Sequence, residues 1–170
     1  MRDVDDAGAG AGAGNLAGFL PYQLSVASNA VSGLIAERYR KRFGLKIPEW
    51  RVMAVLGDTA APRGAMTQRA LTAATVMDKV AVNRAVKVLE ERGLVARVPN
   101  PVDGRSHLLA LTDEGRAIHG EVMPLARATE RELLAGLAPG EEAMLRRLLS
   151  GLRGRATGLA SDARGGPEQD

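Results

Sequence analysis

One short stretch of this 170-residue chain carries the pattern that is typical of β-strands. Residues 94–98 and 107–111 are apolar runs, and Pro-Asn-Pro-Val-Asp-Gly between them is dense in turn-forming residues. This pattern predicts one β-hairpin whose loop is longer than a two-residue turn. Elsewhere apolar residues recur at helical spacing, and aromatic residues make up 3% of the chain. The composition therefore favours packed helices over a large sheet.

The rest of the ordered chain is predicted to be helical, with boundaries set by apolar spacing, glycines and prolines. The expected helices cover residues 21–44, 47–56, 67–71, 78–93, 112–134 and 139 onward. Thr67, Asp78 and Thr112 are expected N-caps, because their side-chain oxygens can accept hydrogen bonds from first-turn N–H groups. Residues 1–16 are expected to be a disordered Ala/Gly tail, and residues 158–170 a flexible C-terminal tail.

The helix expected at 78–93 has two different faces. Its apolar residues lie four and three positions apart and are expected in the core: Val82, Val86 and Leu89. The opposite face carries Lys79, Asn83, Arg84 and Lys87. A helix fits the major groove of DNA, where asparagine can pair with adenine and arginine can bind guanine or phosphate. The alternative is the solvated face of an ordinary amphipathic helix.

A short helix, this partly basic helix and the hairpin follow one another in the order of a winged helix-turn-helix. In that arrangement the short helix crosses the DNA backbone, and a basic hairpin tip can enter the neighbouring minor groove. The tip holds Asp103, Gly104 and Arg105, and Arg97 lies on the first strand. A common Asp-Gly turn with incidental charge is the alternative.

Residues 66–116 resemble the MarR family of bacterial regulators, most specifically in NRAVKVLEERGLVAR (83–97) and DGRSHLLALTDEG (103–115). The flanking helices match in order and length, so the resemblance covers about residues 20–156. It implies a mainly α fold with a small β-hairpin wing (α+β). A winged helix-turn-helix DNA-binding domain is expected at 47–112, with helical dimerisation regions at 17–46 and 113–157.

The resemblance implies a sequence-specific, double-stranded DNA-binding transcriptional regulator that acts as a repressor. The recognition helix would enter the major groove, and Arg105 the minor groove. The expected DNA-binding residues are Thr67, Gln68, Lys79, Val80, Asn83, Arg84, Lys87, Arg97, Asp103 and Arg105. The chain departs from the family at Gly104, where an arginine is usual. It also departs at Val80 and Ala81, where many relatives carry Ser and Thr, and this change favours contact with thymine methyl groups.

The resemblance also implies a homodimer on a pseudo-palindromic operator, with half-sites about one helical turn apart. An intramolecular bundle in a monomer is the alternative. Family members often bind small aromatic or lipophilic effectors between the dimerisation helices and the DNA-binding lobe. The candidates here are Tyr22, Trp50, Arg51, His107 and Arg116. Trp50 and Tyr22 can equally be core or interface residues, and His107 a buried structural histidine.

Other functions find less support in the sequence. The chain has no cysteine, and its two histidines are a poor basis for a zinc site, so we expect no metal and no cofactor. No Walker loop or nucleophile motif occurs, so we expect no catalytic residue and no enzyme. A winged-helix module that binds proteins instead of DNA is the main alternative. The net charge of +3 permits an anionic partner without requiring one.

We expect a cytoplasmic protein without contact to a membrane. No run of 18 apolar residues occurs, and the first residues lack the basic and apolar regions of a signal peptide.

Overall fold

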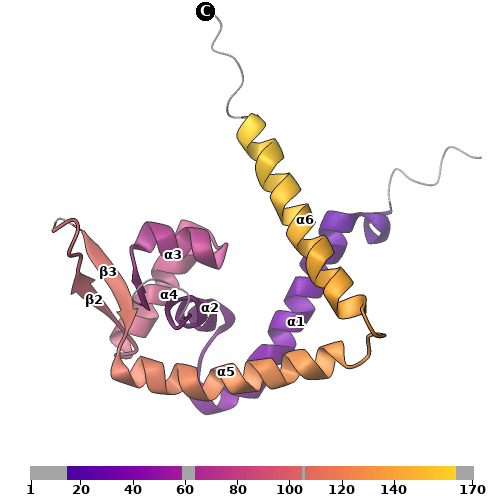
Figure 1. Cartoon of the computed structure of the whole chain (residues 1–170). Helices are drawn as coiled ribbons and strands as arrows, with labels where there is room; N and C mark the ends of the chain where they lie inside the picture. The colour runs from indigo at the N-terminus through magenta and orange to yellow at the C-terminus, as the bar shows by residue number, and fades with distance from the viewer. Residues whose placement is uncertain (1–14, 59–63, 105, 164–170) are drawn as a thin grey trace, which may run out of the picture. The chain divides into compact units, whose positions relative to one another are not determined.

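The computed structural model describes residues 15–58, 64–104 and 106–163 (Figure 1). Its elements are η1 (Leu16–Gly18), α1 (Leu20–Phe43), α2 (Ile47–Leu56), β1 (Ala65–Met66), α3 (Gln68–Thr75), α4 (Lys79–Glu91), β2 (Val95–Pro99), β3 (His107–Leu111), α5 (Asp113–Leu134) and α6 (Glu141–Asp162). The predicted class, mainly α with a small sheet, is confirmed. The chain divides into two compact units, with the boundary between Thr129 and Glu130.

The predicted N-caps are confirmed. Thr67, Asp78 and Thr112 each accept a hydrogen bond on a side-chain oxygen from the backbone N–H three residues on, at 3.2, 2.8 and 3.0 Å. Gly44 follows α1 with a φ of 61°, and Gly93 follows α4 with a φ of 69°. Both are left-handed conformations that glycine adopts without steric cost. Local capping therefore fixes where these helices begin and end.

Three sequence-based boundaries are wrong. The helix α3 ends at Thr75 rather than Leu71, because the alanines that follow favour a helix although they carry no apolar periodicity. The predicted C-terminal tail at 158–170 starts too early, since α6 continues through Gly158 to Asp162. A glycine weakens a helix without ending it. At the other end, Asn15 and Leu16 of the predicted tail at 1–16 are ordered, because Asn15 caps η1 by accepting the N–H of Ala17 (3.1 Å). The other residues of that tail, 1–14, and residues 164–170 lie outside the described residues.

The predicted hairpin is confirmed and belongs to a three-stranded antiparallel sheet in the order β1-β3-β2. Its register pairs Val95 with Leu111 and Pro99 with His107. The additional strand β1, which pairs Ala65 with Ala110, is two residues long and too short to produce a sequence pattern. In Figure 1 the β2–β3 hairpin projects from the helices, with its loop at the free end.

The core of the first unit is built by side chains from α1 to α5 and from the sheet. Val82, Val86 and Leu89 are buried there as predicted, beside residues of α2, α3 and the sheet. Tyr39 of α1 and Val122 of α5 are buried in the same cluster. The helices flanking the winged segment therefore take part in its core, in addition to any role between subunits.

The second unit consists of the end of α5 and α6. Arg146 joins them, because its guanidinium pairs with Glu130 at 2.9 Å and with Glu142 at 2.8 Å. No residue of α6 is buried in the single chain. None of the helices within the described ranges combines the length and the apolar character that a membrane span requires.

Candidate nucleic-acid interface

The helix α4 presents the polar face that the sequence predicts. Lys79, Asn83, Arg84 and Lys87 are exposed, and Val80 at its start is 56% exposed. Asp78 starts the helix by capping it, so these residues occupy its first and middle turns. N-terminal turns of a recognition helix are the part that reaches base edges in the major groove. The geometry of this face is therefore suited to duplex DNA.

The turn between α3 and α4 is strained. Val76 has a φ of 53° and is 86% exposed. A β-branched residue in the left-handed region is rare, and such strain tends to occur at functional positions. Val76 is not among the predicted site residues, because nothing in the amino-acid pattern marks a positive φ at a non-glycine residue. This turn directs α3 onto α4.

The predicted residues at the start of α3 have partners within the protein. Thr67 uses its hydroxyl oxygen to cap α3. The Gln68 amide N–H donates a hydrogen bond to the side-chain oxygen of Asn83. The exposed sides of α3 and α4 are thus linked directly, and two predicted DNA-binding residues act as one polar pair.

Two of the predicted cations are partly neutralised by acids. Arg97 on β2 pairs with Glu90 at 2.8 Å, and Lys87 lies 3.8 Å from Glu91. Neither Lys79 nor Arg84 has an ion-pair partner among the described residues. The net positive charge of the α4 face is therefore concentrated in its N-terminal half.

The wing loop is shaped by residues that the sequence analysis did not name. The Asn100 side chain accepts the N–H of Val102 (3.0 Å) and donates to the Ser106 hydroxyl (2.7 Å). Ser106 N–H donates to the Asp103 carbonyl at 3.0 Å. Asp103 is exposed in this loop. Arg105, predicted for the minor groove, lies outside the described residues.

The five predicted effector residues are spread over four elements. Tyr22 is exposed on α1, Trp50 and Arg51 lie on α2, and His107 is on β3. The guanidinium of Arg116 on α5 is engaged by the Asp113 carboxylate and the Leu111 carbonyl, both at 2.5 Å. His107 is exposed, so the interpretation as a buried structural histidine is wrong.

Trp50 instead packs beside a histidine that sequence reasoning missed. Its ring lies 5.7 Å from that of Tyr39 and stacks on His119 at 5.6 Å. Burial raises the pKa of Tyr39 to about 12, so this phenol stays neutral. A Cβ on Gly57 would lie 2.4 Å from Nε2 of His119, so the glycine makes room for the ring.

His119 is held as a neutral imidazole. Its Nε2 is buried and has no hydrogen-bond partner among the described residues. Burial lowers the pKa of His119, and the negative charge of Asp58 offsets part of that effect. A histidine in an amphipathic helix carries no sequence signal of such surroundings.

The fold and this exposed face define a winged helix-turn-helix DNA-binding protein, with α3 and α4 as the helix-turn-helix and β2–β3 as the wing. A sequence model described as "MarR family" matches residues 43–106. The chain is 32% identical to the MarR family transcriptional regulator SPO1453 from Silicibacter pomeroyi DSS-3, covering 82% of this chain and 99% of that one with a TM-score of 0.66. The chain belongs to the MarR family and is a DNA-binding transcriptional regulator.

Two further relatives are informative. The transcriptional repressor NicR from Pseudomonas putida is 31% identical over 86 residues, which are 51% of this chain and 54% of NicR. The PcaV transcriptional regulator from Streptomyces coelicolor, solved in complex with its natural ligand, is 27% identical. That match covers 85% of this chain and 98% of PcaV, with a TM-score of 0.69. These relatives are transcriptional regulators rather than enzymes, and the predicted family is confirmed.

Proposed function

We propose that this protein is a repressor that binds a pseudo-palindromic operator as a homodimer, with α4 in the major groove. The observation that carries the proposal is the exposed N-terminal half of α4. There Lys79 and Arg84 have no acidic partner among the described residues. Cations in that position neutralise phosphates and reach base edges. The relative NicR is named a repressor, which supports the proposed sign of regulation.

Each predicted residue has a role in this proposal. Arg84 contacts guanine or phosphate, Asn83 with Gln68 reads a base edge, and Val80 contacts a thymine methyl group. Lys79 and Lys87 contact phosphates, Thr67 positions α3 at the DNA backbone, and Arg105 with Asp103 occupies the minor groove. Arg97 contributes little while Glu90 neutralises it.

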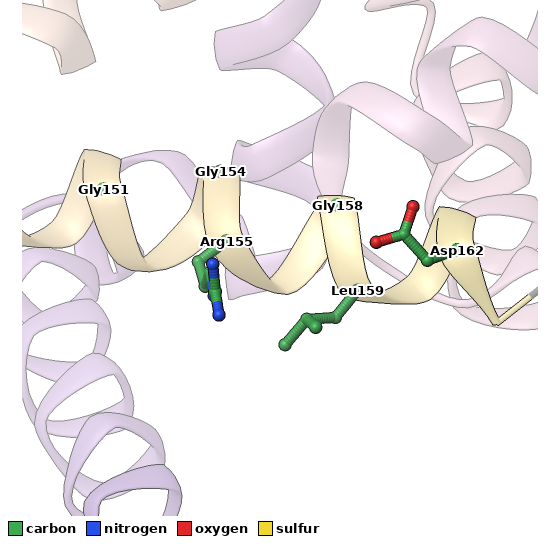
Figure 2. A pocket seen from close by; sticks show the side chains of 6 residues that line it. All are labelled: Gly151, Gly154, Arg155, Gly158, Leu159 and Asp162. Carbon is green, nitrogen blue, oxygen red and sulfur yellow. The ribbon is translucent and has the colours of Figure 1, made fainter.

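The homodimer is supported by apolar surface that one chain leaves uncovered. The large apolar residues of α6 are exposed: Met144, Leu145, Leu148, Leu149, Leu152 and Leu159. Such a stripe on a helix is normally buried against another surface. Further along α6, Gly151, Gly154 and Gly158 leave a shallow hollow beside Arg155, Leu159 and Asp162 (Figure 2). We assign residues 17–46 and 113–157 to the dimer and 47–112 to DNA binding.

A small aromatic or lipophilic effector is proposed to release the repressor. PcaV was solved with its natural ligand, which supports a ligand-controlled regulator in this family. Trp50 is the least accessible of the five candidates, because its side chain is buried in the core between Tyr39 and His119. The candidates that a ligand can reach are Tyr22, Arg51, His107 and Arg116. The dimer is proposed to have two conformations that differ in the distance between its two DNA-binding domains. The effector acts by binding one of these conformations more tightly than the other. Because its target is chromosomal DNA, the protein is proposed to act in the cytoplasm.

The first experiment selects the duplexes that the protein binds from a random DNA library. Footprinting then maps the protein on the most enriched sequence and on the DNA flanking the protein's own gene. We expect two inverted half-sites about one helical turn, roughly 10 base pairs, apart. Addition of small aromatic acids should then weaken the protection of the operator, because the effector releases the protein from DNA. Failure to enrich any sequence, or enrichment of a single asymmetric site, would contradict the proposed operator.

A further inference from the structure

A groove with a volume of about 540 Å³ runs beside the recognition helix. Lys46, Pro48 and Glu49 at the start of α2 form one wall, and the other wall includes Arg84, Lys87 and Glu91 of α4. We propose that this groove receives the sugar-phosphate ridge of one operator strand and that Lys46 is a further phosphate-contacting residue. The inference rests on the proposed function, since it requires α4 to lie in the major groove.

The charges that face the groove leave it positive. Glu49 is 4% exposed and is already used within the protein, because it accepts the backbone N–H of Lys46 at 2.8 Å and lies 3.9 Å from Arg92. Glu91 is matched by Lys87 at 3.8 Å. Lys46 and Arg84 have no ion-pair partner among the residues that the structure describes. Two of the three cations are thus available to an anion.

The shape of the groove fits a phosphate strand. A helix with its side chains is about 10–12 Å across and fills the major groove, which is about 12 Å wide. The phosphates of the two strands must then pass along both flanks of α4. On the flank that faces α2, the helix carries the small residues Ala81 and Ala85, which leave room beside Arg84. The exposed Lys46 lies across that space.

Lys46 is expected to add affinity without sequence information, because an ammonium is a point charge and a phosphate is the same at every base pair. This separates it from Arg84 and Asn83. A lysine at the start of a helix outside the helix-turn-helix gives no sequence signal, and only the packing of α2 against α4 places it at the groove.

The test measures the affinity of the full chain for its selected duplex over a range of salt concentrations. Each neutralised phosphate contributes about 0.9 to the slope of log K against log salt. Lys46→Gln should therefore lower that slope by about 1 for each subunit bound, and the affinity roughly eightfold per subunit at 0.1 M salt. Lys46→Arg should keep the slope. Lys41→Gln removes a charge from the exposed surface of α1 and serves as the matched control, provided that size-exclusion chromatography gives it the same oligomeric state as the parent, because α1 is assigned to the dimer.

Three results would overturn the inference. The first is an unchanged slope for Lys46→Gln, and the second an equal loss for Lys41→Gln. The third is a changed base preference for Lys46→Gln in a repeated selection, which would make Lys46 a base-reading residue. All of these leave the proposed function intact, because they require a parent protein that binds DNA. A parent that binds no duplex would instead refute the proposed function. Far-ultraviolet circular dichroism confirms that each variant folds, and Lys46→Gln keeps the backbone N–H that Glu49 caps.

Discussion

The side chain of Gln68, at the start of α3, donates a hydrogen bond to the side-chain oxygen of Asn83 in the middle of α4. An asparagine that pairs with adenine in a bidentate manner must use its oxygen and its NH₂ group together. Gln68 occupies one lone pair of the Asn83 oxygen, so the second lone pair and the NH₂ group of Asn83 stay available to a base edge. The bond to Gln68 therefore fixes the orientation in which the Asn83 amide can read adenine.

The Gln68–Asn83 pair should act as one unit in DNA recognition. We expect Asn83→Ala and Gln68→Ala each to relax the base preference at the same operator position, at a cost of about 1–3 kcal/mol. The double variant should lose less than the sum, with a coupling energy of about 0.5–3 kcal/mol. A double-mutant cycle of dissociation constants checks this expectation. Additive losses, or losses at different base positions, would show that the two side chains act independently.

The Glu90–Arg97 pair at 2.8 Å sets a second prediction. Glu90→Gln removes the acid that neutralises Arg97, so the affinity for DNA and its salt dependence should both rise. Arg97→Gln in the parent should change affinity by less than about 1 kcal/mol, since the arginine is already paired. Glu37→Gln on the exposed surface of α1 controls for the loss of one negative charge. An equal gain for both glutamate variants would assign the effect to net charge alone.

Gly115, in the first turn of α5, allows this helix to pack closely against Leu94, which follows α4. A Cβ at this position would lie 2.0 Å from the Leu94 carbonyl oxygen. That oxygen cannot move away easily, because it accepts a hydrogen bond from the backbone N–H of Thr112. Gly115→Ala should lower the free energy of unfolding by about 1–3 kcal/mol or more. Gly120→Ala, in the same helix but with open space around it, should raise it by up to about 1 kcal/mol. Denaturant unfolding of both variants measures the difference, and equal effects would contradict the described contact.

His119 should make the stability depend on pH. Its pKa is lowered by burial from the ordinary value of 6.5, so below about pH 6.5 the unfolded chain binds more protons than the folded one. This contribution to stability is complete above about pH 6.5 and is lost as the pH falls towards the lowered pKa. His119→Phe keeps the stacking on Trp50 and should lose less stability between pH 7.5 and 5.5. Parallel pH profiles for the two proteins in urea unfolding would refute this role.

Local patterns predicted the parts of the fold that local physics decides. The caps at Thr67, Asp78 and Thr112 and the hairpin follow from side chains within a few residues. The exposed face of α4 follows from its 3.6-residue period. The strand β1 lacked any pattern, because it depends on pairing with the distant β3.

Contacts between distant residues account for what the sequence did not predict at the site. The pairing of Arg97 with Glu90, the stacking of His119 on Trp50 and the place of Lys46 beside α4 arise only when separate elements pack. Residue type alone marked Arg97 as a DNA contact, although a neighbouring acid neutralises it. Residue type also made Trp50 an effector candidate, with a core position as the alternative, and the structure confirms the core position, where its ring neighbours are Tyr39 and His119.

The salt dependence of operator binding tests the central claim most directly, when the parent is compared with a variant that carries Lys79→Gln and Arg84→Gln. We expect the slope of log K against log salt to fall by up to about 2 for each subunit, with the base preference relaxed where Arg84 reads a base. The exposed arginines of α5, replaced in Arg127→Gln/Arg131→Gln, provide the same change in charge elsewhere, and size-exclusion chromatography checks that this variant keeps the parent's oligomeric state. If the α4 variant keeps the parent's slope and preference, or if the α5 control loses as much, the basic face of α4 is not the surface that binds DNA.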